Sequence, residues 1–227
     1  IYNGKYVAIK VPDTIKGITP TAIGENCFKN SDIVNIELPK TIDELENNAF
    51  ENSSLQRIVA EGVESCWNSA VFKNCFSLNE EYMPNITYLG EEAFYNCSMI
   101  NTLSFKDNLK TAEIQCLSGT GITEADFPNL TYINRAFEST PVKTASLPKL
   151  KDLNGAFRGC TLLESVYIPN VYKIGEYAFG GCVSLPQDMD FSKITEVGSN
   201  GFAEAPFEII DLPNCTKLWG CAFKDAF

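Results

Sequence analysis

The chain has 227 residues, with 18 Lys or Arg, 29 Asp or Glu and no His, so its formal net charge is −11. This acidic balance argues against nucleic acid and anionic membrane surfaces as partners, because no basic excess can replace the counterions of phosphate groups. The absence of His excludes Ser-His-Asp and Cys-His nucleophiles and every His-ligated metal site. At 44% hydrophobic residues the chain can bury a core. No stretch reaches the roughly 18 consecutive apolar residues of a membrane helix, so we expect no membrane insertion by this segment.

A small residue followed by a large apolar one recurs along the chain, most often as Ala-Phe. The ten large apolar anchors are Phe28, Phe50, Phe72, Phe94, Leu117, Phe137, Phe157, Phe179, Phe202 and Phe223. The steps between them are 22, 22, 22, 23, 20, 20, 22, 23 and 21 residues. A nearly fixed period of this length indicates a solenoid, in which each repeat buries its apolar side chains only by stacking on its neighbours.

Each repeat also predicts one short strand about ten to twelve residues after the anchor, where apolar and outward residues alternate and Pro often follows. In chain order, the clearest of these strands end at Leu38-Pro39, Met83-Pro84, Phe127-Pro128, Leu147-Pro148, Ile168-Pro169 and Leu212-Pro213. Pro closes a strand because it cannot donate a hydrogen bond to the ladder. One strand per repeat without a hairpin turn predicts parallel strands stacked about 4.8 Å apart. We therefore expect one domain over residues 1–227, built of about ten repeats of 20–23 residues.

This pattern resembles the BspA-like, Treponema-type leucine-rich repeats of bacterial surface proteins. The match is clearest in residues 163–169, Leu-Glu-Ser-Val-Tyr-Ile-Pro, followed by residues 174–182, Ile-Gly-Glu-Tyr-Ala-Phe-Gly-Gly-Cys. The resemblance implies an α/β-type solenoid: a right-handed coil with a parallel sheet on its concave face, and irregular loops with short helical turns on its convex face. Two repeats depart from the pattern, with Cys66-Trp67 in place of Ile-Gly and Cys116-Leu117 in place of Ala-Phe, and we expect local distortion there.

The resemblance also implies a secreted or cell-surface, extracellular location and a role in adhesion to host matrix proteins or other cells. The chain begins at Ile1 without an initiator Met, and we expect it to be a piece excised from a longer protein whose flanks carry the targeting signals.

Nine Cys can indicate a disulfide framework in a secreted protein, or small buried side chains. The columns favour the second interpretation, because Cys alternates with Ala, Ser and Thr both one residue before and three residues after the anchors. Cys66, Cys215 and Cys221 fall outside these columns, and the sequence leaves open whether any of them forms a disulfide. No C-x-x-C pair is present, so we predict no metal site and no cofactor.

The outward residues of the predicted strands form the candidate partner-binding surface, since stacked strands are the usual binding face of a solenoid. The candidate residues are Glu37, Arg57, Tyr82, Asp126, Tyr167, Asp188, Asp190 and Asp211. Tyr82 and Tyr167 would be anchors in an acidic strip, because Tyr is frequent among interface hot spots and acidic groups favour a basic partner patch. The plain alternative is that these columns are simply solvated surface.

The sequence therefore predicts a non-enzymatic protein-binding ectodomain. Alternatives are a spacer that presents another domain, and a glycan-binding module that uses exposed aromatic residues. The wide spacing of Tyr and Trp along the chain argues against the glycan interpretation. A rival surface lies at the turns around the anchors, where we expect Tyr95, Tyr177 and Trp219. An enzyme would need converging polar side chains, and no column supplies them.

Overall fold

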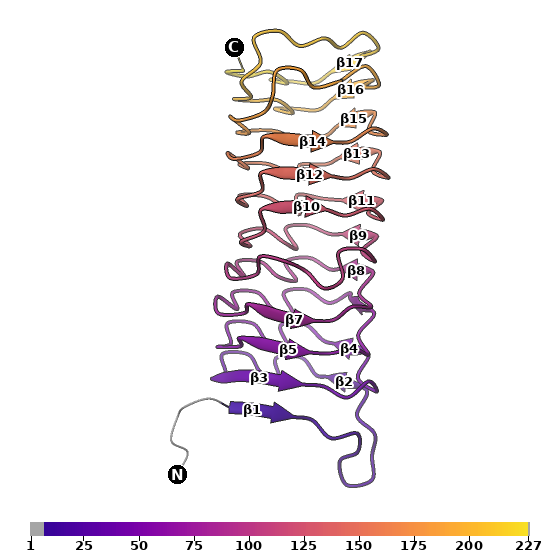
Figure 1. Ribbon diagram of the computed structural model, residues 1–227, viewed down its shortest axis with the longest axis vertical. Helices are drawn as coiled ribbons and strands as arrows, with labels where there is room; N and C mark the ends of the chain where they lie inside the picture. Colours follow the sequence, from indigo (N-terminus) through magenta and orange to yellow (C-terminus); the bar gives the residue numbers. More distant parts are fainter. Residues whose placement is uncertain (1–6, 227) are drawn as a thin grey trace.

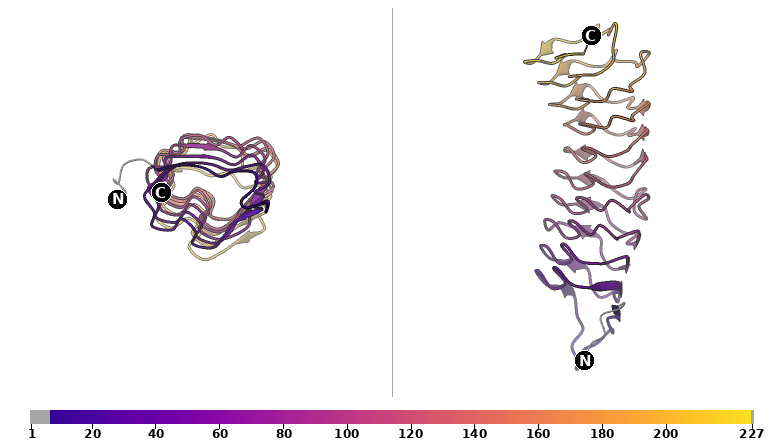
Figure 2. Two further views of the ribbon diagram at one scale, coloured as in Figure 1. Left: turned by 90° about the horizontal axis from the view of Figure 1, so that it is seen from below. Right: turned by 90° about the vertical axis from the view of Figure 1, so that its left-hand side faces the viewer.

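The computed structural model describes residues 7–226, so residues 1–6 and 227 of the predicted domain lie outside the described part. The chain winds into a column of stacked coils, and successive coils follow nearly the same path around a common interior (Figures 1 and 2). One face of the column, here called the main strand face, carries most of the predicted strands together with one that precedes the first anchor, whereas the strand expected to end at Leu212-Pro213 does not form. The strands of this face are β1 (Val7–Lys10), β3 (Ile33–Glu37), β5 (Arg57–Val59) and β7 (Glu80–Tyr82), then β10 (Glu124–Asp126), β12 (Thr144–Ser146) and β14 (Ser165–Tyr167).

All pairings on this face are parallel, in the orders β1-β3-β5-β7 and β10-β12-β14. The prediction of a repeat solenoid with stacked parallel strands is therefore confirmed. The ladder, however, is broken into two sheets between β7 and β10. Figure 1 shows one coil without a strand in this interval.

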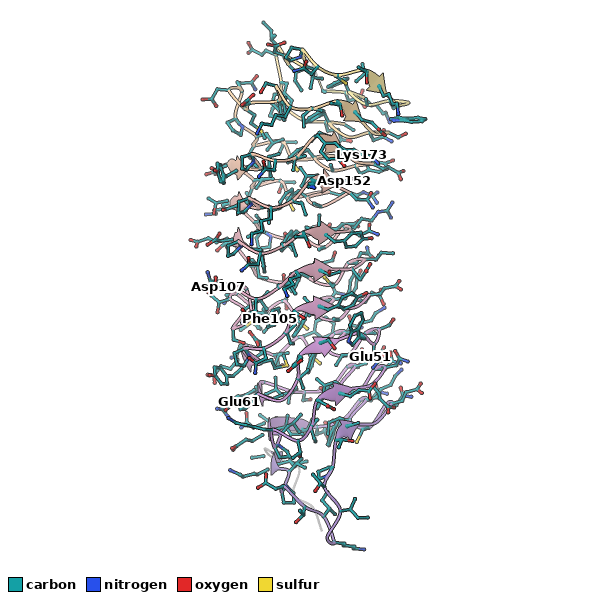
Figure 3. All side chains as sticks on the ribbon, turned by 90° about the vertical axis from the view of Figure 1, so that its right-hand side faces the viewer. Glu51, Glu61, Phe105, Asp107, Asp152 and Lys173 are labelled. Carbon is teal, nitrogen blue, oxygen red and sulfur yellow. The ribbon has the colours of Figure 1, made fainter. Side chains whose placement is uncertain are left out.

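A second strand face, which the sequence analysis missed, contains strands of only two residues each. Most of them end at an apolar residue just before the anchor dipeptide. The strands are β2 (Ala22–Ile23), β4 (Glu44–Leu45), β6 (Ser65–Cys66), β8 (Tyr88–Leu89), β9 (Thr111–Ala112), β11 (Tyr132–Ile133), β13 (Asp152–Leu153), β15 (Lys173–Ile174), β16 (Glu196–Val197) and β17 (Lys217–Leu218). They also pair in parallel, in the orders β2-β4, β11-β9-β8-β6 and β13-β15-β16-β17. Figure 3 views this face, where Asp152 and Lys173 stand on adjacent coils with Oδ2 and Nζ 3.4 Å apart.

The expectation of short helical turns is wrong, because residues 7–226 contain turns but no helix. The reason lies in the hydrogen bonding after each second strand. Asn48 and Asn52 have positive φ angles of 55° and 57°, a conformation that ends a right-handed turn after a few residues. The N–H of Phe50, between them, donates to the carbonyl of Val71 on the next coil rather than back along its own chain. The turns are thus tied to neighbouring coils and do not propagate as helices.

The anchors form a file of stacked rings inside the column, interrupted once at Leu117. Successive rings from Phe28 to Phe94 stack with centroids 4.9–5.2 Å apart, and those from Phe137 to Phe223 stack at 5.6–5.9 Å. Where Leu117 interrupts the file, Phe105 packs against Phe94 and Phe127 packs against Phe137. The predicted aromatic core is confirmed, and its discontinuity lies beside the break in the main strand face.

The cysteines are all free thiols, which excludes a disulfide framework in this structure. Four of them are buried three residues after an anchor, and each thiol donates to a Phe carbonyl oxygen 3.0 Å away; these are Cys75, Cys97, Cys160 and Cys182. Cys66 is buried as the inward residue of β6. Cys27, expected among the small buried residues, is exposed, because its turn is the first of its kind in the described residues and only one side is covered by a coil.

Candidate functional site: the main strand face and its break

The strand registers place most predicted site residues in two outward columns. In the first sheet, Glu37 aligns with Val59 and Tyr82, and Arg57 aligns with Glu80. In the second sheet, Asp126 aligns with Ser146 and Tyr167. The rings are well exposed, at 50% for Tyr82 and 59% for Tyr167.

The structure does not extend these columns to Asp188, Asp190 and Asp211. Within the described chain, β14 is the last strand of the main strand face, and the three Asp residues follow it in turns and irregular segments. The carboxylate of Asp190 accepts a hydrogen bond from the N–H of Ser192 at 2.8 Å. Hydrogen bonding to Ser192 lowers the pKa of Asp190, as expected for a carboxylate that stabilises a turn.

The acidic strip is also partly neutralised by neighbouring coils. Glu37 pairs with Lys10 at 2.9 Å, Glu80 pairs with Arg57 at 3.3 Å, and Asp126 lies 3.7 Å from Lys106. Such exposed pairs contribute little to stability. Because these charged groups are paired with one another, the exposed side chains of Tyr82 and Tyr167 are the most distinctive groups of the predicted surface.

The strand expected around Leu103 does not form. Residues 104–108 make a turn, in which the N–H of Asn108 donates to the carbonyl of Phe105 at 2.9 Å. No Pro follows this segment, although its burial still alternates, with Leu103 and Phe105 in the core and Ser104 exposed. Ser104 is held back toward the preceding coil, because its N–H and its hydroxyl both bind the carboxylate of Glu81.

Glu81 is the residue that the sequence analysis missed. In the register of the ladder it follows Ile36 and Ile58, so it occupies an inward position that is aliphatic in the two preceding coils. Its carboxylate accepts hydrogen bonds from the Ser104 N–H at 2.5 Å and from the Ser104 hydroxyl at 2.7 Å. Burial raises the pKa of Glu81 to about 7, against these hydrogen bonds, which favour the charged form. An acidic residue at a position that is aliphatic in the two preceding repeats was a signal in the sequence that could have identified Glu81.

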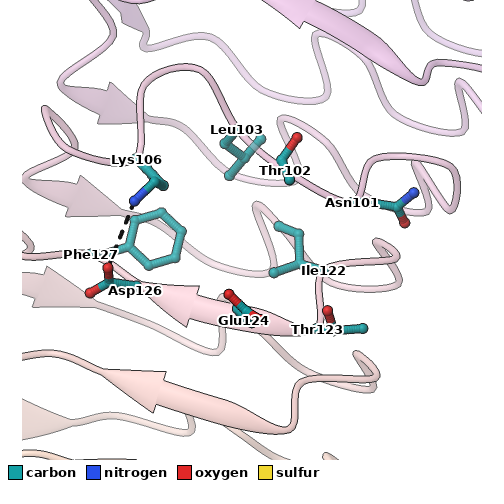
Figure 4. A pocket seen from close by; sticks show the side chains of 9 residues that line it. All are labelled: Asn101, Thr102, Leu103, Lys106, Ile122, Thr123, Glu124, Asp126 and Phe127. Atoms are coloured by element: carbon teal, nitrogen blue, oxygen red, sulfur yellow. Dashed lines mark ion pairs between the residues drawn. The ribbon is translucent and has the colours of Figure 1, made fainter.

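Two hollows flank the coil that fails to form a strand. The first, of about 430 Å³, lies along β7 and is lined by Arg57, Ile58, Asn79, Glu80, Glu81, Tyr82, Thr102, Leu103 and Ser104. The second, of about 330 Å³, lies along β10 and is shown in Figure 4, which also marks the pairing of Lys106 with Asp126. Thr102 and Leu103 separate the two hollows.

On the second strand face the structure gathers aromatic residues that are distant in the sequence. The Trp67 ring stacks on the Tyr88 ring with centroids 4.0 Å apart, and the Tyr88 hydroxyl donates to Glu113 at 2.9 Å. Burial, together with this hydrogen bond, raises the pKa of Tyr88 to about 12. Through Thr111, Tyr132 aligns with Tyr88 on the same sheet. The expectation that the aromatic residues are widely spread is therefore wrong for this group.

The rival surface is only partly where it was expected. Tyr95 and Tyr177 lie in the anchor turns, where Lys73 and Arg158 stand 5.3 and 4.5 Å from the respective ring centroids. Trp219 instead follows β17 on the second strand face, and its indole N–H donates to Glu196 at 3.0 Å. These three residues do not form one surface.

The repeat period, the stacked parallel strands and the anchor turns can be compared with known families. The sequence profile of the BspA type leucine rich repeat region matches residues 21–143 and 153–226, in six copies. The chain belongs to this family. The resemblance of residues 163–182 is thereby confirmed, and the BspA-type repeat is a bacterial leucine-rich repeat scaffold suited to protein interaction.

Solved structures of leucine-rich repeat proteins share the fold. One from Bacteroides ovatus has a TM-score of 0.59 at 20% identity, covering 96% of this chain and 76% of that one. The Treponema pallidum leucine rich repeat protein has a TM-score of 0.55 at 21% identity, covering 82% and 80%. The pneumococcal vaccine antigen PcpA has a TM-score of 0.54 at 13% identity, covering 97% and 66%. No curated protein matches the chain. No helix in residues 7–226 is long and apolar enough to span a bilayer.

Proposed function

We propose that this BspA-type repeat domain is a non-enzymatic protein-binding module of a bacterial surface or secreted protein, which acts in adhesion to host matrix or cell-surface proteins. The observation that carries the proposal is the pair Tyr82 and Tyr167, exposed at equivalent outward positions of the two sheets on the main strand face. Exposed Tyr side chains are frequent among interface hot spots. The family supports a bacterial interaction scaffold, and one structural relative is a vaccine antigen.

A binding screen with matched variants tests this function. Immobilised matrix and cell-surface proteins are probed with the wild-type chain, the double variant Tyr82→Ala/Tyr167→Ala, and the control Tyr172→Ala. Tyr172 is similarly exposed, at 48%, but lies outside the strands of the main strand face. We expect the double variant to bind a captured partner at least about tenfold more weakly, with an unchanged melting temperature. Equal binding by all three proteins would exclude the main strand face as the binding site.

The spacer alternative makes the opposite prediction for the same screen. A spacer needs a stable, stiff column but no specific contact, so none of the immobilised proteins would retain the wild-type chain. The continuous core from Ile23 to Ala222 is compatible with both functions. The exposed Tyr pair is what favours binding.

Glycan binding is a second candidate, which the stacked Trp67 and Tyr88 rings favour. Trp67 is 67% exposed and Tyr132 is 44% exposed, and Glu113 is at hand as a hydrogen-bond acceptor for hydroxyl groups. A flat aromatic surface with a nearby carboxylate can hold a sugar ring by its apolar face and its hydroxyls. A glycan array with the wild-type chain and Trp67→Ala tests it. Loss of a wild-type signal in the variant supports the candidate, and no signal with either protein excludes it.

A further inference from the structure

The break in the main strand face leaves two strand edges without partners. β7 pairs only with β5, and β10 pairs only with β12, so each presents a free edge toward the coil of residues 101–109. A free edge carries main-chain N–H and C=O groups that can accept another strand. Proteins use such edges to bind extended peptide segments. In this chain both free edges open into hollows.

At the edge of β7 the directions of the main-chain groups follow from the hydrogen bonds to the preceding coil. The N–H of Glu80 and the carbonyl of Tyr82 bond back to the preceding coil, to Gln56 and Ala60. In a parallel ladder alternate residues direct their main-chain groups to opposite sides. The N–H and C=O of Glu81 therefore point into the 430 Å³ hollow, where β7 has no strand partner. An extended peptide laid along this edge would find two ladder bonds available at Glu81.

The Glu81 side chain makes this edge chemically selective. Its position is occupied by Ile in the two preceding coils, and a carboxylate there costs more desolvation than an aliphatic side chain. The nearby cations are already paired, Arg57 with Glu80 and Lys106 with Asp126, and Glu81 has no ion-pair partner in residues 7–226. Ser104 supplies hydrogen bonds but no charge. The carboxylate is thus a partly buried hydrogen-bond acceptor without an ion-pair partner in residues 7–226, and a cationic side chain of a bound segment would supply that partner.

The acidic residues around Glu81 favour the binding of a basic peptide segment. Glu80 lines the same hollow, and Glu124 and Asp126 line the hollow on the other side of Leu103. The chain as a whole carries a net charge of −11, so a basic segment is also attracted at long range. The exposed ring of Tyr82 at the rim can additionally face a cation.

We infer that the free edge of β7 binds an extended segment of the protein partner, which adds a strand at Glu81 and places a Lys or Arg side chain against the Glu81 carboxylate. This inference rests on the proposed protein-binding function and names the chemistry of the segment recognised.

A defined probe tests the inference. The probe is a short peptide of alternating Thr and Val with one central Lys, and its matched forms carry norleucine or Glu in place of Lys. Binding to the wild-type chain, Glu81→Gln, Glu81→Ile and the distant control Glu164→Gln is measured by fluorescence anisotropy. Hydrogen exchange over residues 79–83 reports whether a strand is added. Glu81→Gln keeps the size of the side chain and one of the two oxygens that accept from Ser104, and it removes the charge.

We expect the Lys peptide to bind the wild-type chain and Glu164→Gln equally and to slow amide exchange at residues 79–83. We expect affinity to fall at least about tenfold with Glu81→Gln, with Glu81→Ile and with either matched peptide. Equal binding of the three peptides, or no effect of Glu81→Gln, would overturn the inference. Dimers that form without peptide and protect residues 79–83 would also overturn it, since a second copy would then be the occupant.

The two proposals fail separately in these experiments. If a captured partner is lost with Tyr82→Ala/Tyr167→Ala but is unaffected by Glu81→Gln, the protein-binding function stands and the role of Glu81 is wrong. If the Lys peptide binds as expected but the screen finds no protein partner, the edge site stands and the adhesion function is wrong.

Discussion

Glu81 and Ser104 are joined by two hydrogen bonds, from the N–H and the hydroxyl of Ser104 to one carboxylate. Through this pair, the last strand of the first ladder holds the next coil by a side chain where the other coils of that ladder are held by main-chain pairing. The Ser104 hydroxyl also accepts the N–H of Met83 at 2.9 Å, which would otherwise bond to the next strand. The pair, together with the unbroken β8-β9 pairing on the second strand face, ties this coil to its neighbour where the main-face strand is missing.

The pH dependence of stability should reveal the partly buried carboxyl of Glu81. Its pKa is raised in the folded protein from 4.5 to about 7, so the folded state binds the proton more tightly than the unfolded state. The resulting stabilisation is complete below pH 4.5 and is lost as the pH rises through 7. It amounts to at most about 3 kcal/mol. Arg57, Glu80 and Tyr82 line the same hollow, and Arg57 is paired with Glu80.

Urea unfolding from pH 4.5 to 8 measures the effect, taken as the difference between the wild-type chain and Glu81→Gln. As the pH rises, we expect the free energy of unfolding of Glu81→Gln to increase relative to that of the wild-type chain. A difference that is constant over this range would mean that Glu81 titrates normally and is not desolvated.

The ring file should dominate the folding energy. Phe94 is fully buried between Phe72 and Phe105, so Phe94→Ala should lower the free energy of unfolding by about 3–5 kcal/mol. Phe76 is 57% exposed, and Phe76→Ala serves as the control with a much smaller effect. Denaturant unfolding of both variants is the measurement. Similar losses at the two positions would contradict the core assignment.

Thiol reactivity should separate the cysteines by burial. Cys27 and Cys221 are exposed, whereas burial raises the pKa of Cys66 to about 12 and that of Cys160 to about 11, which removes the reactive thiolate. Alkylation of the native protein followed by mass spectrometry should label Cys27 and Cys221 first. All nine should react in urea. Rapid labelling of Cys66 in the native state would show that the coils open readily.

Close stacking of the coils should make one Gly essential and another dispensable. A Cβ on Gly90 would lie 2.6 Å from the carbonyl oxygen of Trp67 and 2.7 Å from that of Cys66, so Gly90→Ala must push two coils apart. We expect a loss of about 1–3 kcal/mol. Gly220 has no atom within 4 Å of such a Cβ, and Gly220→Ala should be neutral. Thermal melts of both variants decide the point, and equal melting temperatures would refute the tight contact at Gly90.

The sequence by itself determined the repeat period, the ring file, the small residues around the anchors and the outward columns that hold Tyr82 and Tyr167. These features are predictable because equivalent positions of successive repeats have the same packing environment, so the spacing alone identifies the residues that share a column. The two-residue strands of the second strand face were missed because they are too short to show alternation. Helical turns were expected wrongly because every second N–H of an anchor turn bonds to the next coil instead of along its own chain, which one repeat does not reveal.

The break in the ladder became clear only in the tertiary structure, although Glu81 in an aliphatic column was one signal of it in the sequence. Leu103 fits the apolar column in the sequence, yet its coil forms a turn, in which Ser104 is hydrogen-bonded to the carboxylate of Glu81 on the preceding coil. The stacking of Trp67 on Tyr88 was also beyond the sequence, since it depends on the register between coils. Periodicity determines what packs inside one coil, whereas a contact between coils depends on which particular side chains the register brings face to face.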